Sequence, residues 1–301
     1  MSRRISPMPS LTTTEFEAER PHLMAVAYRM LGSRAEAEDA VQEAWLRYAK
    51  ARDGGEIRDV RGWLTTVTGR ICLDVLKSAR VSRTAYPGQW LPSYIVEPDA
   101  GPAARAEMSD QVGLALLVVL EKLTPEQRVA LVLHDAFGMP FEDVATVLGT
   151  TESAARQHAS RGRRAVAQDG VRHTADLAEQ RRVLDAFLEA ANGGDLQALA
   201  ALLAPDVVAI GDGGGLVPGV GTRPVLGADK VARFYLGILA GLGEVEVETV
   251  LVNGSLGLLA TGHHASGRPL RAVLAIAVDN GQITGLFSQL NPEKLLLSDL
   301  L

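Results

Sequence analysis

The chain has 301 residues, of which 47% are hydrophobic and 22% are charged, a composition typical of folded globular protein. This length suffices for two or three compact units. No run of about 18 apolar residues occurs, and the basic N-terminal segment lacks a signal-peptide core, so we expect a cytoplasmic protein without a membrane span. The single cysteine, Cys72, excludes an internal disulfide and any multi-cysteine metal cluster. We expect neither a metal ion nor another cofactor.

The net charge of −6 is distributed unevenly along the chain. Residues 1–173 carry 22 basic and 22 acidic side chains, whereas residues 174–301 carry 8 and 14. Within residues 153–172, five arginines accompany one acidic residue, Asp169. Because phosphate responds to local charge, this segment is a candidate for nucleic-acid binding.

Residues 14–80 have the pattern of three consecutive helices. Apolar residues recur at helical spacing from 16 to 31. The sequence SRAE, residues 33–36, is a capping box that opens a second helix, and Asp53-Gly54-Gly55 ends it. The third helix is expected from about residue 60 to residue 80.

Residues 81–106 read as a linker rich in Pro, Ser and Gly. It contains Trp90-Leu91-Pro92, and a tryptophan in a linker needs a surface to cover it. Two alternatives remain open from the sequence: packing on the nearest helix, or docking against another domain.

Residues 107–168 form a second helical segment. Thr124 to Gln127 has the features of a helix start, with Thr as the N-cap and Pro at the first position. A short helix with one apolar face is expected over 141–148, and Thr150 or Thr151 caps the helix that follows. Two short helices joined by a tight glycine-containing turn predict a helix-turn-helix.

The pattern changes after about Asp176. Two helices separated by a Gly-Gly turn are followed by apolar runs with strand character, and Asp279-Asn280-Gly281 predicts a hairpin between the last two. The predicted fold is therefore multidomain: two all-α domains followed by an α+β cone, with a curled antiparallel sheet around an apolar pocket.

Two helices present basic and polar side chains suited to DNA. Arginine and glutamine read guanine and adenine edges in a major groove, and a basic face with an aromatic residue can hold single-stranded DNA. The alternatives are a solvated arginine face and, for the tryptophan, a core position. The candidates on the later helix are Thr151, Ser153, Arg156, Gln157, Ser160, Arg161, Arg163 and Arg164; those on the earlier helix are Arg61, Trp63, Thr65, Thr66, Arg70, Lys77 and Arg80.

These segments resemble a known family. YRMLGSRAEAEDAVQEAWLRYAK and RGWLTTVTGRICLDVLKSAR are similar to region 2 of extracytoplasmic-function (ECF) sigma factors, and LEKLTPEQRVALVLHDAFGMPFEDVATVLGTTESAARQHASRGRRAV is similar to their region 4. The C-terminal part resembles a SnoaL-like domain. One subgroup with this fusion carries three short motifs, which occur here as Trp90-Leu91-Pro92, Asp212-Gly213-Gly214-Gly215 and Asn291-Pro292-Glu293-Lys294-Leu295.

The resemblance implies a domain order: region 2 over 14–80, the linker over 81–106, region 4 over 107–170 and the SnoaL-like domain over 176–295. It implies an alternative sigma factor whose region 2 segment 58–83 meets the −10 element and whose arginine-rich helix meets the −35 element. It implies that the C-terminal domain contacts the linker and modulates activity. The residues expected to bind the polymerase core are Asp39, Gln42, Glu43 and Arg47.

The implied partners are the β and β′ subunits of RNA polymerase core and promoter DNA, without a separate anti-sigma factor. Two positions depart from the commonest form of the motifs: Ser93-Tyr94 follows the linker motif, and Leu216-Val217 follows the glycine turn.

SnoaL-like cones also include isomerases and cyclases that use a carboxylate and a polar partner in an apolar pocket. The candidates for such a site are Asp206, Asp212, His263, His264 and Arg271. Consecutive strand residues point to opposite faces, so at most one of the two histidines faces the pocket. We expect no enzyme, although the pocket is a possible site for a small ligand. The alternative function is a one-component DNA-binding regulator with a ligand-sensing or cyclase-like C-terminal domain.

Overall fold

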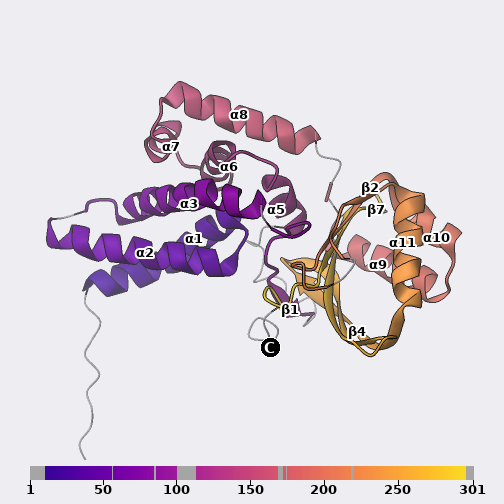
Figure 1. Ribbon diagram of the computed structural model, residues 1–301. Helices are drawn as coiled ribbons and strands as arrows, with labels where there is room; N and C mark the ends of the chain where they lie inside the picture. Colours follow the sequence, from indigo (N-terminus) through magenta and orange to yellow (C-terminus); the bar gives the residue numbers. More distant parts are fainter. Residues whose placement is uncertain are drawn as a thin grey trace, which may run out of the picture. The chain divides into compact units, whose positions relative to one another are not determined.

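The computed structural model describes residues 11–55, 57–84, 86–99, 113–168, 172–173, 175–217 and 220–295 (Figure 1). Within these ranges the chain forms two compact units. The first comprises residues up to Val81 together with Leu123–Ala167, and the second comprises Ser82–Lys122 together with the chain from Gln168 onward. Among the described helices, none has an apolar stretch long enough to cross a membrane.

The first unit is entirely helical. Its elements are α1 (Leu11–Leu31), α2 (Arg34–Asp53), α3 (Val60–Thr84), α6 (Pro125–Leu131), the π-helical turn η1 (Val132–Ala136), α7 (Phe141–Leu148) and α8 (Glu152–Gln168). The three helices expected over 14–80 and the two helices of the helix-turn-helix are all present.

The predicted helix starts are made by the expected side chains. Ser33 Oγ accepts from the Glu36 N–H at 3.3 Å. Thr124 and Gln127 form a reciprocal capping box, with bonds of 3.3 and 3.2 Å. At the second helix of the helix-turn-helix, Thr151 accepts from Ala154 N at 3.2 Å, which decides between the two candidate caps. Local capping chemistry therefore sets these boundaries.

In the first unit, α3 packs closely on the helix-turn-helix. Gly69 of α3 has no side chain, and a Cβ at this position would lie 3.2 Å from Val147 Cγ1 and 3.3 Å from Leu133 Cδ1. Arg128 is 3% exposed, and its Nη1 donates to the Met30 carbonyl at 2.9 Å. Glycine permits the close approach, and the buried guanidinium satisfies a carbonyl in the last turn of α1.

The second unit is an α+β cone. Its helices are α5 (Leu114–Leu120), α9 (Leu177–Asn192), α10 (Leu196–Ala201) and α11 (Ala228–Ala240). Its strands are β1 (Val96–Pro98), β2 (Leu203–Asp212), β3 (Val225–Leu226), β4 (Leu242–Val252), β5 (Ser255–His264), β6 (Pro269–Asp279) and β7 (Gln282–Gln289). They form one sheet in the order β1-β4-β5-β6-β7-β2-β3.

The predicted hairpin between the last two strands is present. Asp279 pairs with Gln282, and the two residues between them, Asn280 and Gly281, have φ angles of 51° and 74°. Two consecutive positive φ values are those of a type I′ turn, which Asn-Gly favours.

Two features of the second unit differ from expectation, and a third concerns the placement of a helix. The sheet is mixed and not wholly antiparallel, because β2 pairs parallel to β7. The linker supplies a strand, since β1 pairs with β4 through Val96 and Val252. Helix α5 packs within the second unit, and it forms, as expected, a helix of the segment 107–168. The sequence of α5 predicts a helix. Because almost all of its residues are apolar, the sequence does not indicate against which of the two units the helix packs.

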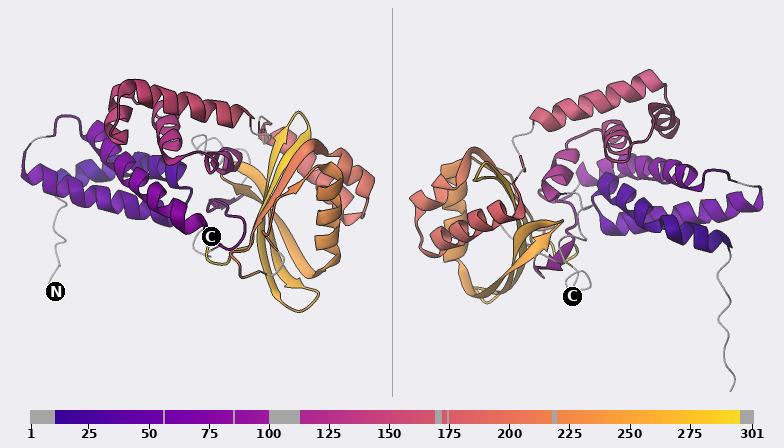
Figure 2. Two further views of the ribbon diagram at one scale, coloured as in Figure 1. Left: turned by 45° about the horizontal axis from the view of Figure 1, so that its top comes forward. Right: turned by 180° about the vertical axis from the view of Figure 1, so that it is seen from behind.

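The core of the cone lies on the sheet face that α9, α10 and α11 cover (Figure 2). Leu184, Phe187 and Leu199 from the first two helices meet Val231 of α11 and Ile276 of β6 in this cluster. Two hydroxyls lie on the same face: Tyr235 of α11 and Ser288 of β7 are 3.1 Å apart. Burial strongly raises the pKa of Tyr235, so this side chain stays protonated.

Candidate functional site

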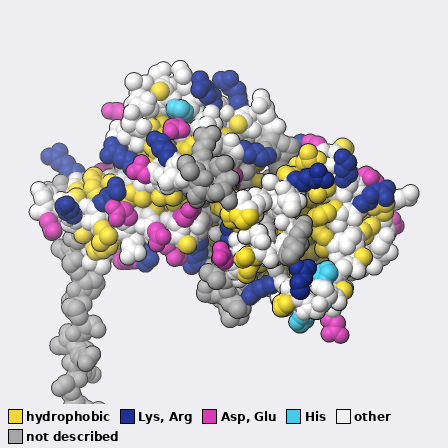
Figure 3. Space-filling model, in the orientation of Figure 1, with side chains coloured by type: hydrophobic (Ala, Val, Ile, Leu, Met, Phe, Trp, Pro, Cys, Tyr) yellow, Lys and Arg dark blue, Asp and Glu magenta, His cyan; other side chains and the backbone are white. Residues whose placement is uncertain are grey.

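The second helix of the helix-turn-helix has one buried and one exposed face. Ala155, Ala159 and Gly162 face inward, and a Cβ on Gly162 would lie 3.3 Å from the Gln127 carbonyl. Small residues therefore let α8 cross the preceding helices at close range. Figure 3 shows Lys and Arg side chains over the part of the first unit that α8 occupies. The exposed side chains of α8 include Ser153, Arg156, Gln157, Arg161, Arg163 and Arg164.

The arginines of α8 differ in their partners. Arg163 makes a bidentate ion pair with Asp135, at 2.6 and 2.7 Å. Arg156 pairs with Glu152 and lies 4.7 Å from the centre of the Phe141 ring, and Arg164 donates to Ser160 at 3.2 Å. Within the described part of the chain, Arg161 has no hydrogen-bond or ion-pair partner. Its guanidinium can therefore take an external partner without exchanging an existing bond.

The candidate residues on α3 divide into exposed and engaged side chains. The Arg61 side chain is 61% exposed, whereas Trp63 is half-buried against Tyr48, with ring centres 5.9 Å apart. Arg70 donates to the Thr146 carbonyl of α7 at 2.9 Å, and Lys77 pairs with Glu126 at 3.6 Å. Thr66 is half-buried, and the side chain of Arg80 lies outside the described residues.

The expectation that Thr65 belongs to an exposed face is wrong. This residue is 4% exposed, and its hydroxyl donates to the Arg61 carbonyl at 2.7 Å. A threonine in a helix can satisfy its hydroxyl on the carbonyl one turn earlier, so a hydroxyl does not by itself indicate a surface position.

The residues expected to bind polymerase core form one face of α2. Asp39, Gln42 and Arg47 are exposed, and Glu43 is half-buried and pairs with Arg47 at 2.8 Å. Leu46 lies on this face with 57% exposure, and we did not predict it. The signal was present, because Leu46 is out of phase with the buried stripe of α2.

A buried carboxylate joins the three short motifs in the second unit. Asp212 is 0% exposed. We call this residue and its neighbours Tyr86, Leu91, Gly214, Asn291 and Lys294 the linker-docking site. Its Oδ1 accepts from the Tyr86 hydroxyl at 2.6 Å and from Gly214 N at 3.0 Å. Its Oδ2 accepts from Leu91 N at 2.9 Å and from Lys294 Nζ at 2.7 Å. A carboxylate with this many donors is the arrangement that makes burial of its charge tolerable.

Lys294 binds the linker through a hydrogen bond to its backbone and through cation–π contacts with its aromatic rings. Its Nζ donates to the Leu91 carbonyl at 2.7 Å and lies 4.2 Å from the Trp90 ring centre and 4.9 Å from that of Tyr86. Two aromatic faces around an ammonium group stabilise it by cation–π attraction. Asn291 of the same motif donates to the Tyr86 hydroxyl at 2.9 Å.

The structure therefore decides between the two alternatives for the linker: its motif docks on the cone. Leu91 is 0% exposed, and Tyr94 donates to the Phe287 carbonyl at 3.0 Å. Pro92 is buried as well, and Leu295 is 7% exposed. Tyr94 occupies one of the positions where this sequence departs from the commonest motif, and it contributes a bond to the docked linker.

The glycines after Asp212 are required by geometry. Gly214 has a φ of 60°, and a Cβ there would lie 2.6 Å from Asn291 Cγ; Gly215 has a φ of 74°, and a Cβ there would lie 2.6 Å from Pro87 Cγ. A Cβ on Gly213 would lie 3.2 Å from the Cβ atoms of Val217 and Val220. The turn can therefore pack against Pro87 of the linker and against Asn291 only without side chains at Gly215 and Gly214.

We expect Gly214→Ala to destabilise the second unit by about 2 kcal/mol or more, because it combines a left-handed alanine with a clash against Asn291. The measurement is the free energy of unfolding in urea. Gly237→Ala is the matched control: Gly237 lies on α11 with nothing within 4 Å of a Cβ, and this change should stabilise by up to about 1 kcal/mol. Equal stability of the two variants would contradict the conclusion that position 214 must lack a side chain.

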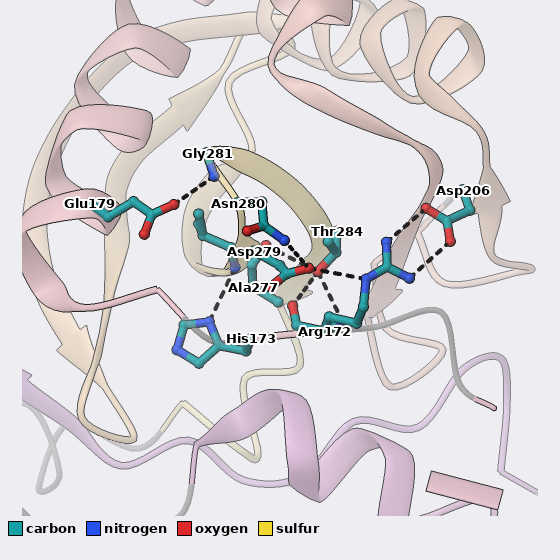
Figure 4. A network of polar contacts seen from close by, with 10 residues as sticks. Arg172, His173, Glu179, Asp206, Ala277, Asp279, Asn280, Gly281 and Thr284 are labelled. Atoms are coloured by element: carbon teal, nitrogen blue, oxygen red, sulfur yellow. Dashed lines mark hydrogen bonds and ion pairs between the residues drawn. The ribbon is translucent and has the colours of Figure 1, made fainter. Parts of the chain in front are cut away.

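Residues 172 and 173, between α8 and α9, are bonded to β2 and to the β6–β7 hairpin, as Figure 4 shows. The Arg172 guanidinium donates to both Asp206 oxygens at 3.2 and 3.3 Å and to Asp279 at 3.2 Å. His173 Nδ1 accepts from Val278 N at 3.1 Å. Burial lowers the pKa of His173, while Asp279 opposes that shift. Sequence reasoning missed these contacts, because neither residue belongs to a periodic pattern or a motif.

The candidates for an enzymatic site do not converge. Asp206 pairs with Arg172 at the surface, and Asp212 belongs to the linker-docking site. His263 is exposed, and His264 bonds to Ser266 at the end of its strand. Arg271 lies an odd number of residues before the core-facing Ile276 on the same regular strand, which places it on the sheet face opposite the helix-covered core. The described residues therefore bring no carboxylate and polar partner together inside the cone.

Comparisons with known proteins agree with this architecture. The chain matches Sigma-70 region 2 over residues 16–81, Sigma-70 region 4 over 113–166 and the SnoaL-like domain over 184–286. It is 43% identical to the ECF RNA polymerase sigma factor SigJ of Mycobacterium tuberculosis, covering 94% of this chain and 93% of that protein. It is 37% identical to the probable ECF RNA polymerase sigma factor SigI of the same species, covering 93% of both chains.

The crystal structure of M. tuberculosis SigJ superposes with a TM-score of 0.73 at 40% identity, covering 95% of this chain and 98% of that one. The chain belongs to the family of ECF RNA polymerase sigma factors and carries a C-terminal SnoaL-like domain. The predicted family and fold class are thereby confirmed.

Proposed function

We propose that this chain directs promoter-specific transcription initiation in the cytoplasm, and that docking of its linker on the SnoaL-like domain modulates that activity. The observation that carries the proposal is the buried Asp212, which binds the linker motif and the C-terminal motif simultaneously. A bond network of this kind couples the segment between the two sigma regions to the cone. The partners are RNA polymerase core, through its β and β′ subunits, and promoter DNA.

The division of roles follows the exposed faces. The α2 face of Asp39, Gln42, Glu43 and Arg47 binds the core, and the exposed side chains of α3 contact the −10 element. On α8, Gln157 and Arg161 lie one helical turn apart and are exposed, so they read base edges. The ion-paired Arg156 and Arg163 exchange their carboxylates for phosphates, which positions the helix without specifying sequence.

We further propose that the fused domain acts without a separate anti-sigma factor and is not an enzyme. The support is that the linker is already held by the same chain, through Leu91, Lys294 and the β1–β4 pairing. Purified chain and core should therefore suffice to observe regulation. Variants of the linker-docking site such as Gly214→Ala should change transcript yield without any third protein.

The test is run-off transcription with purified core polymerase on a library of promoter fragments. We expect transcripts that depend on this chain, and we expect Arg161→Ala to weaken promoter binding by about 1–3 kcal/mol, or roughly 5- to 150-fold. Arg233→Ala is the control, because Arg233 is an exposed arginine on the cone that pairs with Asp229. Absence of transcripts and of core binding would reject the proposal, and unchanged affinity of Arg161→Ala would remove that residue from the promoter interface.

A further inference from the structure

We infer that His22 is a positioning residue for promoter recognition, because it fixes the guanidinium of Arg61 in the orientation that meets the −10 element. The inference rests on the proposed role of α3 in the preceding section. It adds a residue of α1 that carries no charge at neutral pH and lies outside every motif in the sequence.

Three hydrogen bonds connect His22, Arg61 and Thr65 in a closed ring. Arg61 Nη2 lies 3.1 Å from His22 Nδ1, and His22 Nε2 lies 3.1 Å from Thr65 Oγ1. The Thr65 hydroxyl lies 2.7 Å from the Arg61 carbonyl. The ring therefore links the side chain of Arg61 to its own backbone through α1.

The directions of these bonds follow from chemistry alone. A guanidinium has only donors, so His22 Nδ1 must accept from Arg61. The other ring nitrogen, Nε2, then carries the hydrogen of the neutral imidazole and donates to Thr65. Thr65 uses its own hydrogen on the Arg61 carbonyl. Each nitrogen of the His22 imidazole therefore acts only as a donor or only as an acceptor. This pattern requires the neutral form of His22.

The surroundings of His22 keep it neutral. Burial lowers its pKa from 6.5, Arg61 and Arg29 lower it further, and Glu19 raises it. The Phe137 ring meets the imidazole edge-on, with centres 5.4 Å apart, and carries no charge. Protonation below this lowered pKa would turn Nδ1 into a donor facing a guanidinium, so the bond to Arg61 is present at neutral pH and lost as the pH falls.

The remaining contact of Arg61 leaves its tip available. Glu19 pairs with Arg61 Nε at 3.4 Å, and the Arg61 side chain stays 61% exposed. One edge of the guanidinium is therefore fixed by α1, while the exposed part can meet a phosphate or a base. Fixing a long side chain in advance reduces the conformational entropy lost on binding. This also explains why Thr65 is buried: it serves Arg61 rather than DNA.

The experiment measures the affinity of the reconstituted holoenzyme for −10 single-stranded and fork-junction DNA between pH 5.5 and 8. Four proteins are compared: wild type, Arg61→Ala, His22→Leu and His22→Gln. Leucine can neither accept nor donate, whereas the glutamine amide can accept from Arg61 and donate to Thr65. Thermal unfolding of each variant checks that the fold is retained.

We expect Arg61→Ala and His22→Leu each to weaken binding roughly tenfold at pH 8, the scale of one lost contact, and the double variant to be no weaker than either. Wild type should lose affinity as the pH falls through the lowered pKa of His22, while His22→Gln should bind like wild type at pH 8 and show no such loss. The inference would be overturned if His22→Leu bound DNA with wild-type affinity, or if the losses of affinity added up in the double variant. Either result would leave Arg61 as a promoter contact. If Arg61→Ala binds normally, both the contact and the positioning role fail, and run-off transcription still reports separately on the sigma function.

Discussion

Asp212→Ala should destabilise the second unit by about 3–5 kcal/mol, the cost of leaving one partner of a buried ion pair alone. The Asp212 side chain is 0% exposed and its partner Lys294 is 13% exposed, so bulk solvent does not compensate the charge that is left behind. The linker should detach as well, since Leu91 N and the Tyr86 hydroxyl lose their acceptor. Urea unfolding gives the stability, and limited proteolysis within residues 86–99 reports the detachment.

Asp206→Ala is the matched control. Asp206 is also an ion-paired aspartate of the second unit, but its side chain is 53% exposed. Exposed pairs contribute little because water and salt screen them, so its stability should stay within the error of the measurement. Similar losses for the two aspartates would show that burial of Asp212 is not what holds the linker.

Arg128→Ala should destabilise the first unit by about 3 kcal/mol. The change leaves the buried Met30 carbonyl without this donor, which costs about 1–3 kcal/mol, and it removes a largely buried aliphatic stem whose packing is also lost. Arg128 is 3% exposed and joins α6 to α1. The measurement is the unfolding transition of the helical unit followed by circular dichroism.

The control for this variant is Arg20→Ala on α1. Arg20 pairs with Glu17 at 3.8 Å, and both side chains are more than half exposed. Its removal should leave the transition unchanged within error. A stable Arg128→Ala protein would mean that the bond to Met30 is replaced by water, contrary to its burial.

Helix boundaries and the helix-turn-helix could be predicted because their signals are local. Thr124 and Gln127 are three residues apart, and the hairpin at Asn280 needs only its own two central residues. The three short motifs indicated that the linker meets the cone, but not how. That Asp212 is the shared acceptor depends on contacts between positions such as 91, 212 and 294, which no periodicity relates.

The expectations from the sequence that proved wrong or incomplete also have physical reasons. The parallel pairing of β2 with β7 joins strands far apart in the sequence, and strand pattern alone carries no direction. Thr65 reads as a surface hydroxyl because it is polar and follows the exposed Arg61 by one helical turn, yet it is buried and donates to the Arg61 carbonyl. His22 stands alone in the sequence, and only its neighbours in space give it a role.

The packing of Gly69 against Val147 has a consequence for how the protein meets a promoter. In this structure α3 and α7 lie in van der Waals contact at Gly69, and Arg70 donates to the Thr146 carbonyl. If α3 and α8 contact two promoter elements that lie apart on the DNA, as proposed, this packing must be released before both contacts can form.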